Sequence, residues 1–169
     1  MKRIVWEGRF LTAVTDDRWE YAERKGGMTA VVIVAHDGED VLLIEQYRVP
    51  VGRRVLELPA GLVGDEGEET PVAAAARELE EETGYRAAQI EQLGEFFSSP
   101  GMTSERFTFV RATGLTRVGD GGGVAGEDIT VHRVRLADVP AFVAAKRREG
   151  VAVDAKVAVL GLLGSSPRP

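Results

Sequence analysis

Four glutamates crowd a five-residue stretch near the middle of the chain: Glu78, Glu80, Glu81 and Glu82. On a helix that turns about 100° per residue, Glu78, Glu81 and Glu82 fall on one face, whereas Glu80 points the opposite way. Like charges at this spacing weaken a helix, and its C-terminal end disfavours anions. Carboxylates that share a face suit Mg²⁺ or Mn²⁺ better than zinc. A glutamate run is also typical of a solvated helix face, so both interpretations are open from these residues alone.

The sequence on either side of the glutamates predicts a well-defined helix. Thr70 is suited to the N-cap position, Pro71 to the first helical position and Gly84 to the residue after the helix. A glycine-rich segment with Gly61, Gly64 and Gly67 precedes this helix. A loop followed by an acidic helix therefore favours a bound cation over a plain solvated face.

The rest of the chain predicts strands and helices without regular strand–helix–strand spacing. This pattern indicates a mixed α/β or α+β fold, with helices on both sides of a mixed sheet. The turn signal at 37–40 predicts a hairpin between the strands on either side of it. The predicted strands are 9–14, 19–24, 28–36, 41–48, 55–58, 89–97, 105–112 and 129–136, and the other predicted helices are 137–148 and 154–163.

Composition narrows the classes of function. The 169 residues suit one domain, and the absence of cysteine excludes disulfides and cysteine-based metal or catalytic sites. The net charge of −6, without a run of basic residues among aromatics, argues against a nucleic-acid partner. The apolar stretch 28–35 is too short to cross a bilayer, and the N-terminal residues lack a signal-peptide core. We therefore expect no membrane partner and a cytoplasmic protein.

The segment from Gly61 to Tyr85 resembles the Nudix box, the signature G-x5-E-x7-R-E-U-x-E-E-x-G-U of the Nudix hydrolase superfamily, in which U is a bulky apolar residue. Glu69 and the run 77–84 match it in register. Seven residues rather than five separate Gly61 from Glu69, and Tyr85 occupies the last apolar position. The resemblance implies a three-layer α/β/α sandwich over 27–164, with 1–26 as extra N-terminal strands and 165–169 as a flexible tail.

Segments outside the box resemble the ADP-ribose pyrophosphatase-like subfamily. They are 44–48, 56–61, 99–106 and 127–132. The resemblance implies Mg²⁺-dependent hydrolysis of ADP-ribose to AMP and ribose 5-phosphate. GDP-mannose hydrolases share the Ser-Pro-Gly…Glu pattern in looser form, so GDP-mannose or another nucleoside-diphosphate sugar is the alternative substrate. A non-catalytic domain that senses ADP-ribose is a third hypothesis, against which the complete set of metal-binding glutamates argues.

The resemblance also implies a role for individual residues. Two or three Mg²⁺ ions, with Mn²⁺ as a substitute, are expected on the Ala60 carbonyl and on Glu78, Glu81 and Glu82. Glu81 also counts as catalytic, and Glu127 is the expected general base, carried by a glycine-rich loop (119–126) flexible enough to close over substrate. Substrate contacts are expected from Arg48, Gly61, Met102 and Glu105. Structural roles are expected from Glu69, Arg77 and Gly84, with Arg77 paired to carboxylates of the box such as Glu69.

Three further expectations concern residues around this set. Glu57 either contacts a metal or supports its neighbours, whereas His36 and His132 are expected to be structural. In the subfamily, extra N-terminal strands often pack against a partner subunit and help to form the adenine pocket. We therefore expect a homodimer, in which the N-terminal aromatic residues belong either to the core or to the subunit contact; these are Trp6, Phe10 and Trp19.

Overall fold

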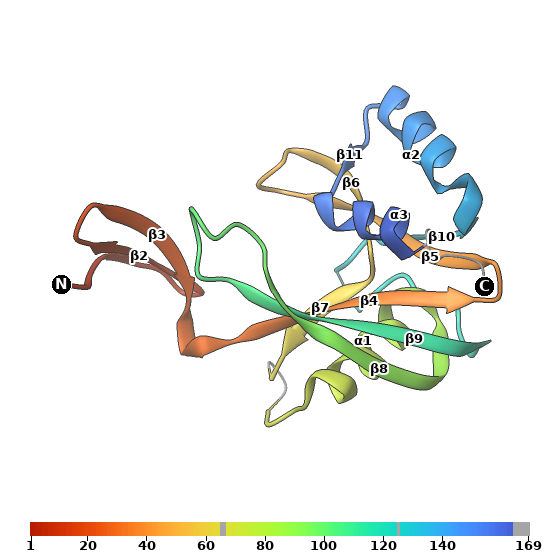
Figure 1. Ribbon diagram of the computed structural model, residues 1–169, viewed down its shortest axis with the longest axis horizontal. Coiled ribbons are helices and arrows are strands. Elements are labelled where there is room, and N and C mark those ends of the chain that lie inside the picture. Colours follow the sequence, from red (N-terminus) through yellow and green to blue (C-terminus); the bar gives the residue numbers. More distant parts are fainter. Residues whose placement is uncertain (65–66, 125, 164–169) are drawn as a thin grey trace.

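A computed structural model describes residues 1–64, 67–124 and 126–163 (Figure 1). The flexible tail predicted at 165–169 lies outside the described residues. Along the chain the elements are β1 (Arg3–Glu7), β2 (Leu11–Asp16), β3 (Trp19–Arg24), η1 (Lys25–Gly27), β4 (Thr29–Asp37), β5 (Asp40–Arg48), β6 (Arg53–Glu57), β7 (Ala60–Val63), α1 (Pro71–Thr83), β8 (Tyr85–Phe97), β9 (Arg106–Arg117), β10 (Thr130–Arg135), η2 (Leu136–Asp138), α2 (Val139–Arg148), β11 (Ala152–Val153), η3 (Ala155–Ala158) and α3 (Val159–Leu163).

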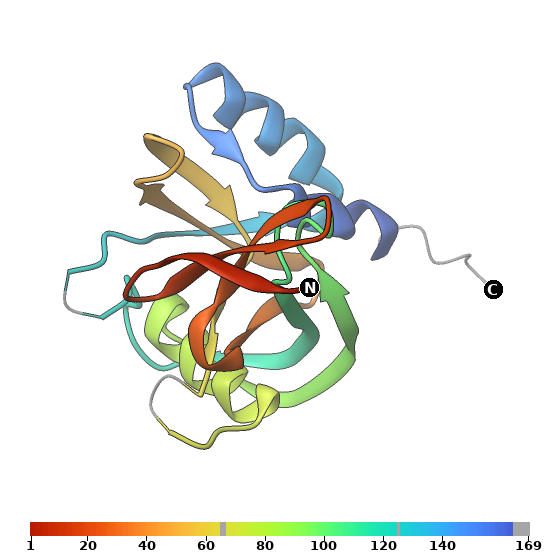
Figure 2. The ribbon, with the colours of Figure 1, turned by 90° about the vertical axis from the view of Figure 1, so that its left-hand side faces the viewer.

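The main sheet is mixed, as the sequence predicts. Within the described residues its strand order is β11-β6-β5-β4-β9-β8, with β10 also paired to β5 and β7 also paired to β4. The β4–β9 and β6–β11 pairs are parallel, and the other pairs of this sheet are antiparallel. Helix α1 covers one side of the sheet, whereas α2 and α3 cover the other (Figures 1 and 2). This is the three-layer sandwich that the sequence predicts.

Strand β4 lies in the centre of the sandwich and supplies both halves of the core. Val31 and Ile33 pack with α1, whereas Val32 and Val34 point to the opposite side and pack with α2 and α3. Successive side chains of a strand alternate between the faces of a sheet, so a strand covered on both sides needs apolar residues at every position. This explains the unbroken apolar run in β4.

Strands β4 and β5 form the predicted hairpin only close to its turn. They pair through His36 with Val41 and through Asp37 with Asp40, and then separate. Beyond this point β4 pairs with β7 and β9, whereas β5 pairs with β6 and β10. The separation of the two strands leaves space between the two halves of the sheet, and the candidate site lies there.

Helix α1 begins and ends where the sequence predicts. The Thr70 hydroxyl accepts a hydrogen bond of 3.2 Å from the Ala73 N–H, and Gly84 follows the helix in the left-handed conformation with φ of 73°. The buried stripe of the helix runs through Ala75 and Leu79 to Glu82, at i, i+4 and i+7. The fold therefore places the carboxyl group of Glu82 on the side of α1 that faces the sheet.

The first three strands form a separate antiparallel sheet that projects from the sandwich (Figure 1). It contacts the β8–β9 loop through Ala22, whose N–H donates to the Met102 carbonyl and whose carbonyl accepts from the Ser104 N–H. The sheet leaves several large apolar side chains exposed: Ile4, Val5, Trp6, Phe10, Leu11 and Trp19. The N-terminal sheet is therefore tied to the sandwich by few contacts and offers an apolar surface.

Several predicted element boundaries are wrong. Residues 60–63 form β7, which pairs with β4, and β8 begins at Tyr85 rather than at residue 89. The single helix predicted for 154–163 is divided into η3 and α3, because Asp154 caps a short 3-10 turn by accepting from the Lys156 N–H. Within the described residues, no helix is long and apolar enough to span a membrane.

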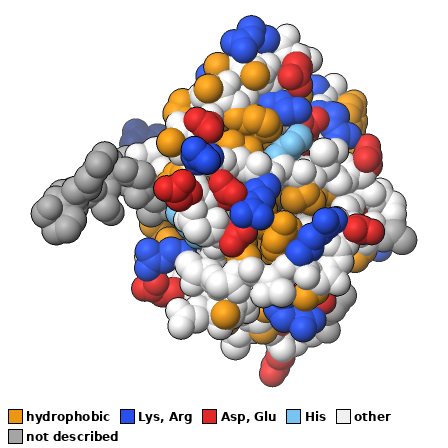
Figure 3. Space-filling view, turned by 90° about the vertical axis from the view of Figure 1, so that its right-hand side faces the viewer, with side chains coloured by type: hydrophobic (Ala, Val, Ile, Leu, Met, Phe, Trp, Pro, Cys, Tyr) orange, Lys and Arg blue, Asp and Glu red, His pale blue; other side chains and the backbone are white. Residues whose placement is uncertain are grey.

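The face opposite the N-terminal sheet carries charges of both signs in close alternation (Figure 3). One group of such charges lies at the β4–β5 turn, where the guanidinium group of Arg133 pairs with Asp37 at 2.9 Å and with Asp40 at 2.7 Å. Exposed pairs of this kind contribute little to stability individually. On this face the charges therefore form a mixed polar surface.

Candidate active site

A cleft of about 760 Å³ occupies the space where β4 and β5 have separated. Its walls come from β3, β4, β5, β6, β7, α1, β9 and η3, and from the segments that lead into β6, β9, β10 and η3. Among its lining residues, three basic side chains each pair with a carboxylate that also lines the cleft: Arg24 with Glu105, Arg48 with Glu57, and Lys156 with Asp154. The other acidic residues of the lining are Glu78, Glu82 and Glu127. The cleft therefore has an acidic excess around the end of α1.

Glu82 is the most buried carboxylate of the cleft, with 5% of its surface exposed. Burial, together with the nearby charges of Glu78 and Glu127, raises the pKa of Glu82 to about 8. A hydrogen bond of 2.9 Å from the Ala60 N–H to Glu82 Oε2 only partly offsets these effects. A carboxyl group in this environment is stabilised as an anion when a cation binds beside it.

The backbone of β7 faces the glutamates of α1. The Ile33 N–H donates to the Pro59 carbonyl, and the register pairs Val32 with Ala60, so the alternation of an antiparallel pair turns both the N–H and the C=O of Ala60 away from β4. The N–H of Ala60 reaches Glu82 in this direction. A Cβ atom on Gly61 would lie 1.9 Å from the Glu78 carboxyl carbon, so Glu78 packs directly on the Gly61 backbone.

This set of oxygens fits a hard divalent cation by its chemistry. Two carboxylates at i and i+4 on α1 and a backbone carbonyl turned to the same side are ligands that Mg²⁺ accepts, with waters completing its shell. Within the described residues, no three acidic or histidine side chains are already gathered into a closed cluster of ligands. Glu78 also accepts a hydrogen bond of 2.9 Å from Arg77, and this bond contributes to the separation of the acidic side chains.

Arg77 links the loop before α1 to the helix. Its guanidinium group donates to Glu69 at 3.2 Å, to Glu78 at 2.9 Å and to Glu81 at 3.1 Å, as well as to the Leu62 carbonyl. The hydrogen bonds to Glu69 are the main reason why the pKa of Arg77 is raised. The ion pair between Arg77 and Glu69 that the sequence predicts is therefore present. The longer loop includes residues 65–66, which lie outside the described residues.

Glu81 occupies a different position from its two neighbours. Its carboxylate turns to Arg77, and it is not among the residues that line the cleft. The structure thus brings Glu78 and Glu82 to the cleft and leaves Glu81 beside it. The role of Glu81 as a metal ligand and catalytic group stays a prediction.

The glycine-rich loop before β10 packs on the C-terminal end of α1. The Gly122 and Gly123 N–H groups donate to the carbonyls of Glu82 and Glu81 at 2.9 and 3.0 Å, where the helix leaves carbonyls without partners. Gly121 has φ of 68°, and a Cβ atom there would lie 2.4 Å from the Thr83 carbonyl carbon. This part of the loop is therefore anchored by hydrogen bonds, which differs from the flexible loop that the sequence predicts.

Glu127 follows this anchored segment and reaches the cleft. Its Oε2 accepts a hydrogen bond of 3.0 Å from the Val124 N–H, and its charge contributes to the raised pKa of Glu82. The structure therefore brings together Glu78, Glu82 and Glu127, which are separated by up to 49 residues in the chain. Gly84 makes this packing possible, because a Cβ atom there would lie 2.4 Å from the Gly119 carbonyl oxygen.

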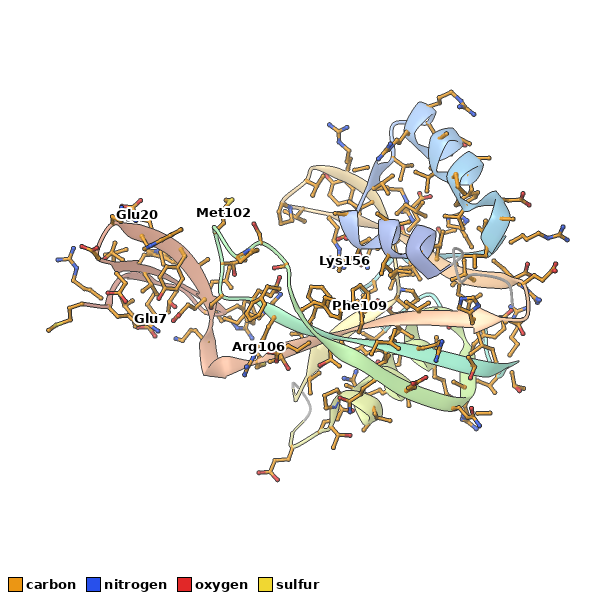
Figure 4. All side chains as sticks on the ribbon, viewed as in Figure 1. Glu7, Glu20, Met102, Arg106, Phe109 and Lys156 are labelled. Atoms are coloured by element: carbon orange, nitrogen blue, oxygen red, sulfur yellow. The ribbon has the colours of Figure 1, made fainter. Side chains whose placement is uncertain are left out.

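The predicted substrate contacts are only partly gathered at the cleft. Arg48, Gly61 and Glu105 line it, whereas Met102 is 72% exposed, lies at the tip of the β8–β9 loop and is not among the lining residues (Figure 4). Arg48 donates to both oxygens of the buried Glu57, and these hydrogen bonds are the main reason why its pKa is raised. Glu57 thus supports Arg48, and its contact with a metal stays a prediction.

Three charged residues of the cleft were not predicted from the sequence as residues of the site. Arg24 reaches it from the end of β3 and pairs with Glu105 at 2.6 Å. Asp154 and Lys156 reach it from the C-terminal segment, where the Lys156 ammonium lies 5.8 Å from the centre of the Phe107 ring (Figure 4). Each is a single charge at the edge of an element, and no sequence pattern distinguishes such residues from ordinary surface charges.

The family model described as the NUDIX domain matches residues 26–153 of this chain. The chain therefore belongs to the Nudix hydrolase family. The match begins after the three N-terminal strands and includes α1 and the cleft residues Glu78, Glu82 and Glu127.

Known proteins with similar sequences or structures carry several names. The chain is 37% identical to a methanol dehydrogenase activator of Bacillus methanolicus over 67% of this chain and 59% of that protein. It is 42% identical to an ADP-ribose pyrophosphatase of Bacillus subtilis over 47% of this chain and 41% of that protein. It is 32% identical to a GDP-mannose pyrophosphatase of Cronobacter sakazakii, over 80% and 72%. A solved structure titled as that of an ADP compounds hydrolase matches with a TM-score of 0.69 and 26% identity, over 85% and 80%.

The first two of these relatives are matched over about half of their own length. The matched parts establish the family and the fold. The activity, the substrate and the partners of the whole protein are therefore proposals.

Proposed function

We propose that this protein is a Mg²⁺-dependent pyrophosphohydrolase that hydrolyses ADP-ribose to AMP and ribose 5-phosphate. The observation that carries the proposal is the buried carboxyl group of Glu82, bonded to the Ala60 N–H at the end of a cleft that also presents Glu78 and Glu127. The names of the relatives support a nucleoside-diphosphate sugar as the substrate class.

The metal would be held by Glu78, Glu82 and the Ala60 carbonyl. Glu81 would turn from Arg77 to join them, and Mn²⁺ could substitute for Mg²⁺. The family resemblance implies two or three ions. When bound, Mg²⁺ would neutralise charge on the diphosphate and acidify the attacking water. The raised pKa of Glu82 supports this assignment, because a buried carboxylate surrounded by like charges needs a compensating cation.

Glu127 would accept the proton of the attacking water. The water oxygen forms a bond to one phosphorus atom of the diphosphate while the bridging P–O bond breaks, and the released phosphate keeps the bridging oxygen. Glu127 suits this role because its carboxyl group lines the same cleft as Glu78 and Glu82. The bond from the Val124 N–H orients one of its oxygens.

Arg48 and Glu105 would bind the substrate on the opposite side of the cleft. Arg48 already donates to Glu57 through two nitrogens, so its planar guanidinium group is held in place and can offer its remaining N–H groups to a phosphate oxygen. Glu105 is fixed by Arg24 through Oε1, which leaves Oε2 to accept from a ribose hydroxyl. Because Gly61 has no side chain, it leaves space beside β7 for Glu78 and for the substrate.

We also propose a homodimer formed through the N-terminal sheet. The exposed apolar side chains of β1 to β3 support it, because such a surface on a small sheet is typical of a subunit contact. A hollow of about 400 Å³ between Trp19 and Tyr21 of β3 and Pro100 of the β8–β9 loop could receive the base of the nucleotide. Sedimentation equilibrium tests the dimer: a mass of 18.2 kDa at micromolar concentration, rather than twice that value, would contradict it.

The substrate is tested with a panel of ADP-ribose, GDP-mannose and other nucleoside-diphosphate sugars, each incubated with the protein and Mg²⁺. Release of AMP or GMP is followed by chromatography. We expect ADP-ribose to give the highest kcat/KM, with AMP and ribose 5-phosphate in equal amounts. Preferred cleavage of GDP-mannose would replace the proposed substrate, and the similarity to a GDP-mannose pyrophosphatase over 80% of this chain supports that alternative. Tight binding of ADP-ribose without cleavage would instead indicate a sensor domain.

A further inference from the structure

Arg54, at the start of β6, donates five hydrogen bonds. Its Nε donates to Glu45 Oε1 at 2.7 Å and its Nη2 to the Glu45 carbonyl at 2.8 Å. On the other side of the guanidinium group, Nη1 donates to Asp128 Oδ2 at 2.8 Å, and Nη2 donates to the Thr130 hydroxyl at 3.0 Å and to the Asp128 carbonyl at 3.3 Å. One side chain therefore joins β5 to the segment that leads into β10.

The β5 end of this connection is firmly held. The Glu45 side chain is only 8% exposed, and its Oε2 lies 3.0 Å from Lys146 Nζ of α2 and 3.2 Å from His132 Nε2 of β10. Burial by itself would raise the pKa of Glu45, but the hydrogen bonds from Lys146, Arg54 and His132 outweigh it, so the pKa is lowered. Glu45 is thus a buried carboxylate at a point where four elements meet: β5, β6, β10 and α2.

The other end of the connection lies next to Glu127. Asp128 follows Glu127 directly, and its side chain is 86% exposed, so the Arg54–Asp128 ion pair alone would contribute little. The bonds to the Asp128 carbonyl and to Thr130 matter more, because they fix the backbone on the C-terminal side of Glu127. On the N-terminal side, Gly122 and Gly123 are bonded to the end of α1. Glu127 therefore lies between two anchored segments.

We infer that Arg54 is a positioning residue that holds Glu127 in place in the cleft through its bonds to Asp128 and Thr130. The inference rests on the proposed function, in which Glu127 accepts the proton of the attacking water. Arg54 is not among the residues that line the cleft, so it acts through the backbone rather than on the substrate. A displacement of about 1 Å of a catalytic group can cost about 100-fold in rate.

The main variant is Arg54→Met, with Arg53→Met as the matched control. Arg53 is the preceding arginine on the same strand and is exposed. We expect Arg54→Met to lower kcat by about 10- to 100-fold with KM changed less than threefold, and Arg53→Met to leave both near the wild-type values. Since loss of Arg54 also leaves Glu45 with fewer partners, the double substitution Asp128→Ala with Thr130→Val serves as a second test. It keeps the Arg54–Glu45 bonds and removes the bonds of Arg54 to the two side chains, so that only the bond of 3.3 Å to the carbonyl of residue 128 is left on that side.

Two measurements separate positioning from a loss of fold. In the Glu127→Gln background, Arg54→Met should change kcat less than twofold, because the group that it positions is gone. Amide hydrogen exchange, measured without substrate, should become faster at 127–130 in Arg54→Met and in the double variant, but not in Arg53→Met. Exchange that speeds up equally throughout the main sheet would show a structural role only, and would overturn the inference.

The outcomes also distinguish this inference from the proposed function. If Glu127→Gln leaves kcat unchanged, the assignment of the base is wrong and the inference falls with it. If Glu127→Gln slows the reaction but both Arg54→Met and the double variant keep the wild-type kcat, the proposed function stands and the positioning role of Arg54 is refuted.

Discussion

The backbone N–H of Ala60 donates a hydrogen bond of 2.9 Å to the buried carboxyl group of Glu82. This bond joins β7 to the last turn of α1, and it exists because the pairing of β7 with β4 turns the Ala60 amide away from its neighbouring strand. The same geometry turns the Ala60 carbonyl to the side of the glutamates. One strand pairing thus brings a backbone carbonyl and the side chains of α1 to the same end of the cleft.

Without divalent metal, Glu82 should make the stability of the protein depend on pH. Its pKa is about 8 in the folded state against an ordinary value of 4.5, so between these pH values the folded state binds a proton that the unfolded state has lost. The free energy of unfolding therefore falls as the pH rises through this window, by an amount on the order of 3–5 kcal/mol. Glu82→Gln should remove this dependence.

Urea unfolding in EDTA at pH 5 and pH 9 measures the effect. We expect the wild type and Glu82→Gln to be similar in stability at pH 5 and the variant to be the more stable at pH 9. A stability difference that is the same at both pH values would contradict the raised pKa of Glu82.

Gly61→Ala should reduce activity with little loss of stability. The added Cβ would lie within 2.3 Å of three atoms of the Glu78 carboxyl end, and this flexible end can move aside without disturbing the sheet. We expect the Mg²⁺ concentration for half-maximal activity to rise about tenfold. The free energy of unfolding, measured in urea, should change by less than about 1 kcal/mol. A variant with normal metal dependence would show that the position of Glu78 does not matter for metal binding.

Gly121→Ala should detach the segment that precedes Glu127 from α1. Its Cβ would meet the backbone of Thr83 and Gly84, which cannot move aside, at 2.4–2.7 Å. Gly38→Ala is the matched control, since Gly38 has φ of 64° against 68° for Gly121 but nothing within 4 Å of an added Cβ. Both variants carry similar backbone strain, so a kcat lowered at least tenfold only in Gly121→Ala would follow from lost packing. Equal effects in the two variants would refute this account.

Glu127→Gln should lower kcat by about 10²–10⁴-fold, the usual contribution of a general base, with a much smaller effect on KM. The amide has the same shape and cannot accept the proton of the water. Pre-steady-state AMP release measures the chemical step directly. An unchanged rate of this step would assign the base to another residue, and a change in KM alone would make Glu127 a binding residue.

Local sequence signals predicted much of the helix and the loop before it. Thr70 and Gly84 carry the cap signals of α1, and the resemblance to the Nudix box implied the ion pair between Arg77 and Glu69. The burial of Glu82 was not predictable in the same way, because it depends on β7, a four-residue strand that pairs with β4 from outside the predicted hairpin. A pattern of four residues is too short to distinguish a strand from a loop.

Contacts between distant segments limited the prediction of the rest of the site. Arg54 and Asp128 are 74 residues apart, and Arg24 and Glu105 are 81 residues apart. Nothing in the local sequence of an arginine reveals which distant carboxylate it will meet, because the strand order of the sheet decides this. The glycines at 121–123 suggested a flexible loop, whereas the fold uses two of them, Gly122 and Gly123, to donate hydrogen bonds to α1.

We propose that Glu82 holds the metal in a cleft that also contains Glu78 and Glu127, and that this cleft hydrolyses a nucleoside diphosphate sugar. The most direct test measures AMP release from ADP-ribose by wild type and Glu82→Gln side by side at saturating Mg²⁺. The account predicts AMP and ribose 5-phosphate in equal amounts from the wild type, and a rate lower by about 10³-fold or more in the folded variant, since the metal supplies several kcal/mol of transition-state stabilisation. A Glu82→Gln protein that releases AMP at the wild-type rate would contradict it.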